Sequence, residues 1–309
     1  MVRVTEIELM DRLFLIGAPG IGKTEVIKQK ALEEAKSLGR EFVDLRRASD
    51  ELKHRILEEP SRYYIFYRVI APHIFPEDIN FPLRNSGEFV KFVPPLDIKI
   101  LTLEGIRGVL FIDEITNLGR KDQESMYLSI INEHELGWNL RLSDGIKVVL
   151  AGNPPEVSSI ANLLSAPTIS RTTVVEVDPP TVDEWGSYME RAYGDDWEKL
   201  TYAYLKVFPT DLFKTPPSPE TLENFPCPRN WTRLALRLKE VRSKSFAEAV
   251  IIGTVGREVG SKFITFMNKT PPPVEEVLER PMILQNLDVG TKVIALNAVA
   301  CRPEALMKR

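Results

Sequence analysis

Residues 17–24 read Gly17-Ala18-Pro19-Gly20-Ile21-Gly22-Lys23-Thr24. They fit the pattern G-x-x-x-x-G-K-[ST] at every fixed position, and the pattern requires a strand before it and a helix after it. The apolar run 13–16 is short enough for a buried strand. Residues 25–38 carry apolar side chains at helical spacing, and Gly39 suits a helix end. A loop in this context directs backbone N–H groups at one point above a helix N-terminus, which predicts a polyphosphate site.

The residue types inside this loop match the chemistry of such a site. Gly20 and Gly22 permit backbone angles and a close ligand approach that a Cβ would prevent. Lys23 supplies a mobile positive charge for the outer phosphates. The Thr24 hydroxyl is a suitable ligand for Mg²⁺, which prefers oxygen. The alternative is an ordinary glycine-rich turn before a helix, but the flanking elements favour the phosphate loop.

A second apolar run, residues 109–112, ends in Asp113 and Glu114. A buried strand that ends in two carboxylates is costly unless they meet a cation at the edge of the sheet. Ligands of parallel sheets bind beyond the carboxyl ends of the strands, so both side chains are expected beside the loop 17–24. Asp113 is predicted to hold Mg²⁺ through water, and Glu114 to polarise an attacking water. An acidic helix cap after a buried strand is the alternative.

Three later residues are candidates on weaker patterns. Asn153 follows an apolar run at 147–151 and is a possible partner of the attacking water, although Asn-Pro is also an ordinary turn. Arg171 directly precedes a β-branched run at 172–177, where a solvated strand-edge arginine is the alternative. Arg229 follows a proline at the start of an expected helix.

The order of these elements resembles that of AAA+ ATPases: phosphate loop, Asp-Glu strand, Asn at a strand end, Arg before the next strand, and Pro-Arg opening a late helix. The resemblance covers about residues 10–245, and the loop and the Asp-Glu strand are its most specific motifs. Three details are similar to the MoxR-type branch of that family: Phe92-Val93-Pro94-Pro95, Ala151-Gly152-Asn153-Pro154-Pro155-Glu156 and Trp185.

The resemblance implies that residues 17–24 bind ATP and that Thr24 and Asp113 hold Mg²⁺. Members of the family form homo-oligomeric rings, usually hexamers, and couple ATP turnover to the remodelling of a partner. In the MoxR-type branch that client is often a von Willebrand factor A-type protein. Nothing in the chain itself identifies the client.

The resemblance also implies a catalytic role for Lys23, Glu114, Asn153, Arg171 and Arg229. Asn153 is similar to the sensor-1 polar residue. Arg171 is similar to the arginine finger, which reaches the nucleotide of the neighbouring subunit. Arg229 is similar to the sensor-2 arginine of the helical lid. Arginines placed in this way stabilise the charge on a transferring phosphoryl group.

The expected fold is an α/β P-loop NTPase core with a parallel five-stranded sheet flanked by helices, followed by a smaller all-helical lid domain. Prolines after the last strand place the boundary there, giving residues 1–180 for the core and 181–309 for the lid and tail. Residues 60–108 are expected to be an insertion with an added strand and a proline-rich connection. The insertion is either a surface for a neighbour or client, or a simple extension of the core. Residues 138–145 fit a short hairpin, of the kind that lines the ring pore in relatives.

Composition argues against several other classes of function. The net charge is −4, with 40 basic and 44 acidic residues intermixed, so a nucleic-acid footprint is not indicated. The 2 cysteines and 3 histidines lack metal-ligand spacing. Apolar stretches fall short of the ~20 residues that cross a bilayer, and acidic residues interrupt the N-terminus where a signal peptide would lie. Unpaired cysteines suit a reducing compartment, so we expect a cytoplasmic protein.

Three hypotheses about function follow. The first is a MoxR-like ATPase that remodels or assembles a protein partner, and it predicts that a protein client stimulates turnover. The second is a nucleic-acid-dependent motor, which predicts stimulation by DNA or RNA with a steep loss on adding salt. The third is a nucleotide-gated assembly factor with slow turnover, which predicts that a Glu114→Gln variant stays functional.

Overall fold

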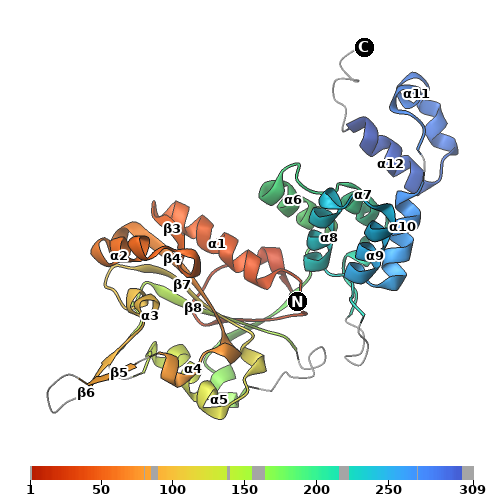
Figure 1. Cartoon of the computed structure of the whole chain (residues 1–309). Helices are drawn as coiled ribbons and strands as arrows, with labels where there is room; N and C mark the ends of the chain where they lie inside the picture. The colour runs from red at the N-terminus through yellow and green to blue at the C-terminus, as the bar shows by residue number, and fades with distance from the viewer. Residues whose placement is uncertain are drawn as a thin grey trace. The chain divides into compact units, whose positions relative to one another are not determined.

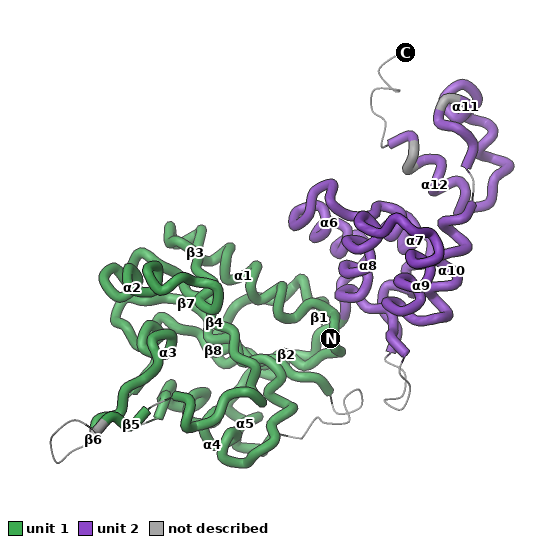
Figure 2. The backbone as a smooth tube through the Cα atoms, in the orientation of Figure 1, with its two compact units in different colours: residues 1–178 green, residues 179–309 purple. Residues whose placement is uncertain are grey.

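The computed structural model describes residues 2–79, 81–84, 90–137, 140–154, 164–215, 223–269 and 271–300. The chain divides into two compact units, residues 1–178 and 179–309 (Figure 2). Several predictions from the sequence fall partly outside the described ranges: Pro155 and Glu156 of the MoxR-like motif, residues 138 and 139 of the expected hairpin, and Cys301, one of the two cysteines.

The first unit is a parallel sheet with helices on both faces (Figure 1). Its strands are β1 (Val2–Arg3), β2 (Leu13–Ile16), β3 (Glu41–Asp44), β4 (Tyr63–Ile70), β7 (Arg107–Asp113), β8 (Ile146–Gly152) and β9 (Thr173–Asp178). Its helices are α1 (Lys23–Ser37), α2 (Asp50–Glu58), α3 (Leu96–Leu101), α4 (Lys121–Glu133) and α5 (Ala166–Ile169). This arrangement confirms the expected fold class.

The number of strands differs from the expectation: among the described residues the sheet has seven strands rather than five, in the order β1-β9-β2-β8-β7-β4-β3. One addition is the two-residue edge strand β1, which pairs with β9. The other is β4, which lies between β3 and β7 and is parallel to both. The expected added strand is therefore real, and it lies inside the core rather than on its surface.

Both faces of the central strands are buried, which explains their continuous apolar sequences. Leu110 and Ile112 on β7 belong to a core cluster that includes Tyr127 and Ile130 of α4. On the opposite face α1 covers the sheet with Ile27, Ala31 and Ala35 (Figure 1). Leu38 does not join this face, because the helix ends at Ser37 and Leu38 is exposed.

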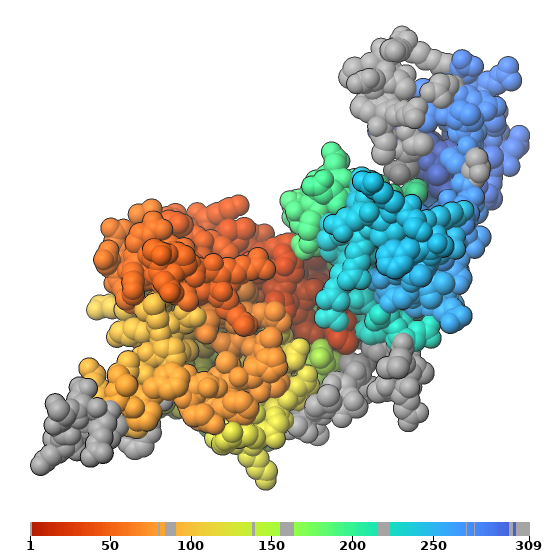
Figure 3. Space-filling model, viewed as in Figure 1, coloured from red at the N-terminus to blue at the C-terminus, as the bar shows by residue number. Residues whose placement is uncertain are grey.

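The rest of the insertion forms an antiparallel hairpin of β5 (Phe81–Arg84) and β6 (Val90–Val93). Figure 1 shows that this hairpin extends away from the sheet, and in Figure 3 its described residues lie at the margin of the first unit. Three large apolar side chains on it are exposed: Phe81, Leu83 and Phe92. Further on, an antiparallel bridge joins Glu135 to Arg141 at the expected 138–145 hairpin. The insertion thus has a core part, β4, and a surface part, the β5–β6 hairpin.

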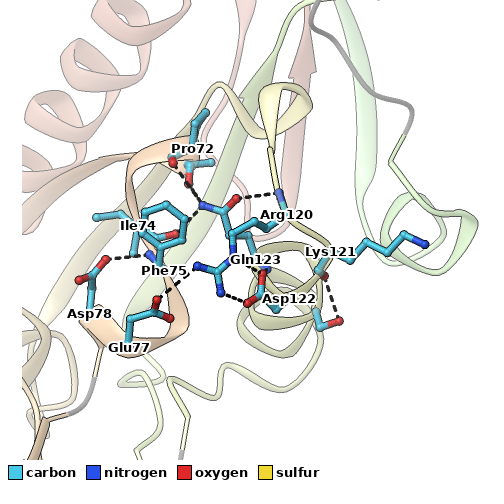
Figure 4. Close-up of polar contacts among 11 residues, drawn as sticks. Pro72, Ile74, Phe75, Glu77, Asp78, Arg120, Lys121, Asp122 and Gln123 are labelled. Atoms are coloured by element: carbon cyan, nitrogen blue, oxygen red, sulfur yellow. Dashed lines mark hydrogen bonds and ion pairs between the residues drawn. The ribbon is translucent and has the colours of Figure 1, made fainter.

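The connection between β4 and this hairpin is fixed to the start of α4 (Figure 4). The side chain of Gln123 is 1% exposed, and its Nε2 donates to the carbonyls of Pro72 and Ile74 at 3.2 and 2.9 Å. The Arg120 guanidinium lies over the Phe75 ring and pairs with Glu77 at 3.3 Å. A buried amide that satisfies backbone carbonyls holds a loop in one path.

The second unit consists of helices around an aromatic core. They are α6 (Val182–Tyr193), α7 (Leu200–Val207), α8 (Pro228–Glu240), α9 (Lys244–Val255), α10 (Arg257–Met267), α11 (Val274–Glu279) and α12 (Val289–Ala300). Thr181 and Glu184 form a capping box at the start of α6. Trp185 and Trp197 are buried in the core of this unit. In the described ranges no helix is both long and apolar enough to cross a membrane.

Candidate nucleotide-binding site

The loop 17–24 has the conformation that its glycines allow. Gly20 and Gly22 have φ of 81° and 104°, in the left-handed region that favours glycine. Gly22 caps α1, which begins at Lys23. A Cβ at Gly17 would lie 2.7 Å from the Val177 carbonyl oxygen, so the loop packs directly on β9. Strand, loop and helix therefore stand where the sequence predicted them.

Lys23 lies inside this loop and is only 8% exposed. Its Nζ donates to the carbonyl of Gly17, to the carbonyl of Ala18 at 3.0 Å and to Oδ1 of Asn153 at 3.1 Å. Asn153 follows β8, which is the sheet neighbour of β2. The structure thus brings two of the predicted site residues into contact, although 130 positions separate them.

Thr24 and Asp113 also meet, because the Thr24 hydroxyl donates to Asp113 Oδ2 at 3.0 Å. Adjacent oxygens of an octahedral Mg²⁺ shell with bonds of 2.0–2.1 Å are about 2.9 Å apart, so this pair has a suitable spacing for the ion. Among the described residues, His, Cys, Asp and Glu side chains form no cluster of three or more that could hold a metal. The donors therefore fit Mg²⁺ held by a few protein oxygens together with phosphates, which is its usual mode of binding.

Glu114 has a left-handed backbone conformation, which is unusual for a residue other than glycine, with φ 59° and ψ 32°. The left-handed region costs a non-glycine residue roughly 1–2 kcal/mol, and such strain is concentrated at functional sites. Within the described part of the chain, the half-buried carboxylate has no hydrogen-bond partner. Glu114 is thus placed beside Asp113, at the end of β7, with its carboxylate available.

The contacts of Arg171 do not include this cluster. Arg171 is exposed, and its guanidinium donates to Asn132 Oδ1 at 2.8 Å and to the Pro167 carbonyl at 2.9 Å. Arg229 belongs to the second unit, where it is exposed on the first turn of α8. The roles of both arginines toward a nucleotide stay predictions.

Two residues of the site were not singled out from the sequence. Thr116 accepts the backbone N–H of Asn153 at 3.1 Å and so links the ends of β7 and β8. Arg68 on β4 donates to Asp113 Oδ2 from Nε at 2.9 Å and from Nη2 at 2.7 Å. The sequence held a signal for Arg68, since it is the one charged residue in the run Tyr-Tyr-Ile-Phe-Tyr-Arg-Val-Ile of β4.

Comparison with known proteins adds a distant relative. No family model matches the chain. Over 173 residues it is 27% identical to the Holliday junction branch migration complex subunit RuvB of Treponema denticola, which covers 55% of this chain and 37% of that protein. The matched part is thus well under half of the relative's length.

Solved structures of Thermotoga maritima RuvB are also similar. The Holliday junction branch migration motor is 17% identical with a TM-score of 0.40, over 94% of this chain and 75% of that one. A substituted form is 20% identical with a TM-score of 0.41, over 96% and 75%. At these TM-scores the likeness says nothing about function. The chain is thus similar to RuvB over part of its sequence, and its first unit has a phosphate-loop geometry beside the Asp-Glu end of β7.

Proposed function

We propose that this chain binds Mg²⁺-ATP at the loop 17–24 and hydrolyses it, as an AAA+ ATPase of MoxR type. The proposal rests on one observation: the ends of β2, β7 and β8 lie together. The Lys23 Nζ bonds to Asn153 beyond β8, and Thr24 bonds to Asp113 at the end of β7. Ligands of open parallel sheets bind at this edge, and loop, lysine, hydroxyl and carboxylate are the parts that phosphoryl transfer needs.

Each side chain then has a defined task. Lys23 and the loop amides bind the phosphates, while Thr24 and Asp113 hold the metal. The metal, when bound, neutralises charge on the β- and γ-phosphates. Glu114 orients a water for attack on the γ-phosphate, and Asn153 positions that water or the terminal oxygens.

A ring of these subunits is proposed to use the energy of ATP hydrolysis to remodel or assemble a protein partner. The exposed position of Arg171 is compatible with a contact to a neighbouring subunit. On the β5–β6 hairpin, Phe81, Leu83 and Phe92 lie on the surface, and about half of each residue is exposed. Exposed apolar residues that gather on one element are typical of a protein contact.

A DNA-dependent motor is the second candidate, because the sequence relative is a subunit of a Holliday junction branch migration complex. The two candidates differ in what raises ATP turnover. We expect DNA, including four-way junctions, to leave turnover unchanged, since the chain has a net charge of −4 with both signs intermixed. Steady-state hydrolysis with and without DNA, at low and high salt, measures this. A DNA stimulation that disappears as salt is added would favour the motor instead.

The nucleotide site itself is tested by Lys23→Ala. We expect ATP to bind about 100-fold more weakly or worse, because a charge-assisted contact to the phosphates is lost, each worth about 1.5–3 kcal/mol. Titration of a fluorescent ATP analogue measures the affinity. Lys36→Ala, on the exposed face of the same helix, is the matched control and should leave the affinity unchanged. Equal affinities of the Lys23→Ala variant and the wild type would remove the assignment of the loop.

A further inference from the structure

Arg68 lies on the strand that the first unit adds to its sheet, next to the strand that carries Asp113. In the register of β4 and β7, Arg68 stands opposite Phe111, and Ile70 stands opposite Asp113. Alternate residues of a strand share a face, so Arg68 and Asp113 lie on the same side of the sheet. The side chain of Arg68 therefore reaches Asp113 along the strand direction, toward the edge where the loop 17–24 lies.

The contact between them is charge-assisted and uses a single carboxylate oxygen. Nε and Nη2 of Arg68 donate to Asp113 Oδ2 at 2.9 and 2.7 Å. The Thr24 hydroxyl donates to the same oxygen at 3.0 Å. Oδ1 accepts the backbone N–H of Glu114 at 3.0 Å. Oδ2 thus has three donors, and a carboxylate oxygen has about two lone-pair sites.

A metal ion and Arg68 are therefore alternatives at Oδ2, the oxygen of Asp113 that also faces Thr24. Mg²⁺, or a water in its shell, needs a lone pair of the carboxylate, and the guanidinium fills that place on Oδ2. A divalent ion and a guanidinium on one carboxylate would also repel each other. The Thr24 contact does not conflict in this way, because a hydroxyl can donate its proton to Asp113 and still offer a lone pair to the ion.

A guanidinium is in general a permanent cation, so only movement can end the contact. Movement is possible, since the Arg68 side chain is 35% exposed while that of Asp113 is 10% exposed. The buried carboxylate is thus the fixed member of the pair, and the arginine is the member with access to solvent.

We propose that Arg68 is a positioning residue that competes with Mg²⁺ for Asp113, so that full metal binding requires its guanidinium to leave Oδ2. This inference rests on the proposed nucleotide site, and it adds a residue that sets the Mg²⁺ demand of that site. Competition of this kind raises the Mg²⁺ concentration at which nucleotide binding tightens.

The test measures the affinity of the full chain for a fluorescent ADP analogue as Mg²⁺ is raised. We compare the wild type with Arg68→Met, which removes the charge and keeps the apolar stem, and with Arg68→Lys, which keeps the charge without the planar fork. For Arg68→Met the Mg²⁺ midpoint should fall by at least about fivefold, the lower end of usual coupling between ligands. For Arg68→Lys it should lie between the other two. Arg47→Met, which alters an arginine in the 3-10 turn Leu45–Arg47 after β3 whose side chain is 82% exposed, should match the wild type.

An unchanged or raised midpoint for a folded Arg68→Met variant would overturn the inference. If that variant does not fold, the Lys variant decides, because a midpoint equal to or above that of the wild type would contradict competition. If the wild type binds ADP and all variants have the same Mg²⁺ midpoint, only the role of Arg68 is overturned. A wild type that binds no ADP would overturn the proposed site together with this role.

Discussion

Replacing Glu114 with Gln is expected to lower ATP hydrolysis by about 10²–10⁴-fold while leaving ATP affinity nearly unchanged. The amide keeps the size of the side chain but cannot accept a proton or polarise the attacking water as a carboxylate does. Glu114 lies directly after Asp113 at the end of β7, half-buried, and its carboxylate makes no hydrogen bond within the described ranges. A group that carries no structural contact is available for catalysis, so its replacement should change the rate rather than the fold.

Single-turnover hydrolysis measures the rate, and titration of a fluorescent ATP analogue measures the affinity. Glu104→Gln is the matched control, since Glu104 is exposed shortly before the same strand. It should behave as the wild type. Hydrolysis at the wild-type rate by the Glu114→Gln variant would remove Glu114 from the reaction. If the predicted stall occurs, the ATP-bound variant can also serve as bait, and a protein that co-purifies with it only in ATP is a candidate client.

The parts of the site that the sequence predicted are those in which neighbouring residues decide the structure. The loop 17–24 is local, because its glycines, lysine and threonine act on a backbone that they themselves shape. The Asp-Glu ending of β7 is local in the same sense. Asn153 required one long-range assumption, that strand ends meet at one edge, and its contact with Lys23 confirms that assumption.

The order of the strands was beyond such reasoning. The run of β4 is apolar and aromatic, which identifies a strand but not its neighbours. Its place between β3 and β7 depends on pairing with residues well separated from it in the sequence, Glu41 with Tyr63 on one side and Tyr64 with Arg107 on the other. The contact of Arg68 with Asp113 is a consequence of that placement, since it spans 45 positions. A charged residue in an apolar strand is expensive to bury, and this cost was the available hint that Arg68 has a partner.

Arg171 is the predicted arginine finger. Its contacts are with Asn132 and with the Pro167 carbonyl on its own surface. If Arg171 acts on the nucleotide of a neighbouring subunit, Arg171→Ala should lower hydrolysis by about 10³–10⁵-fold, the range known for arginine fingers. Arg55→Ala, which removes an exposed arginine from α2, should not. Steady-state hydrolysis at concentrations where the oligomer is verified measures both.

If Arg171 acts on the nucleotide of a neighbouring subunit, a second result is expected that does not follow from action within its own subunit. In a mixture of Arg171→Ala and Glu114→Gln subunits, some interfaces pair an intact Glu114 with an intact Arg171 from the neighbour. Those interfaces should hydrolyse ATP, so the mixture should exceed the activity of either variant alone. An arginine that acts within its own subunit gives no such gain, because every subunit of the mixture then carries one defect. Absence of recovery in verified mixed oligomers would therefore assign Arg171 to its own subunit or to the surface alone.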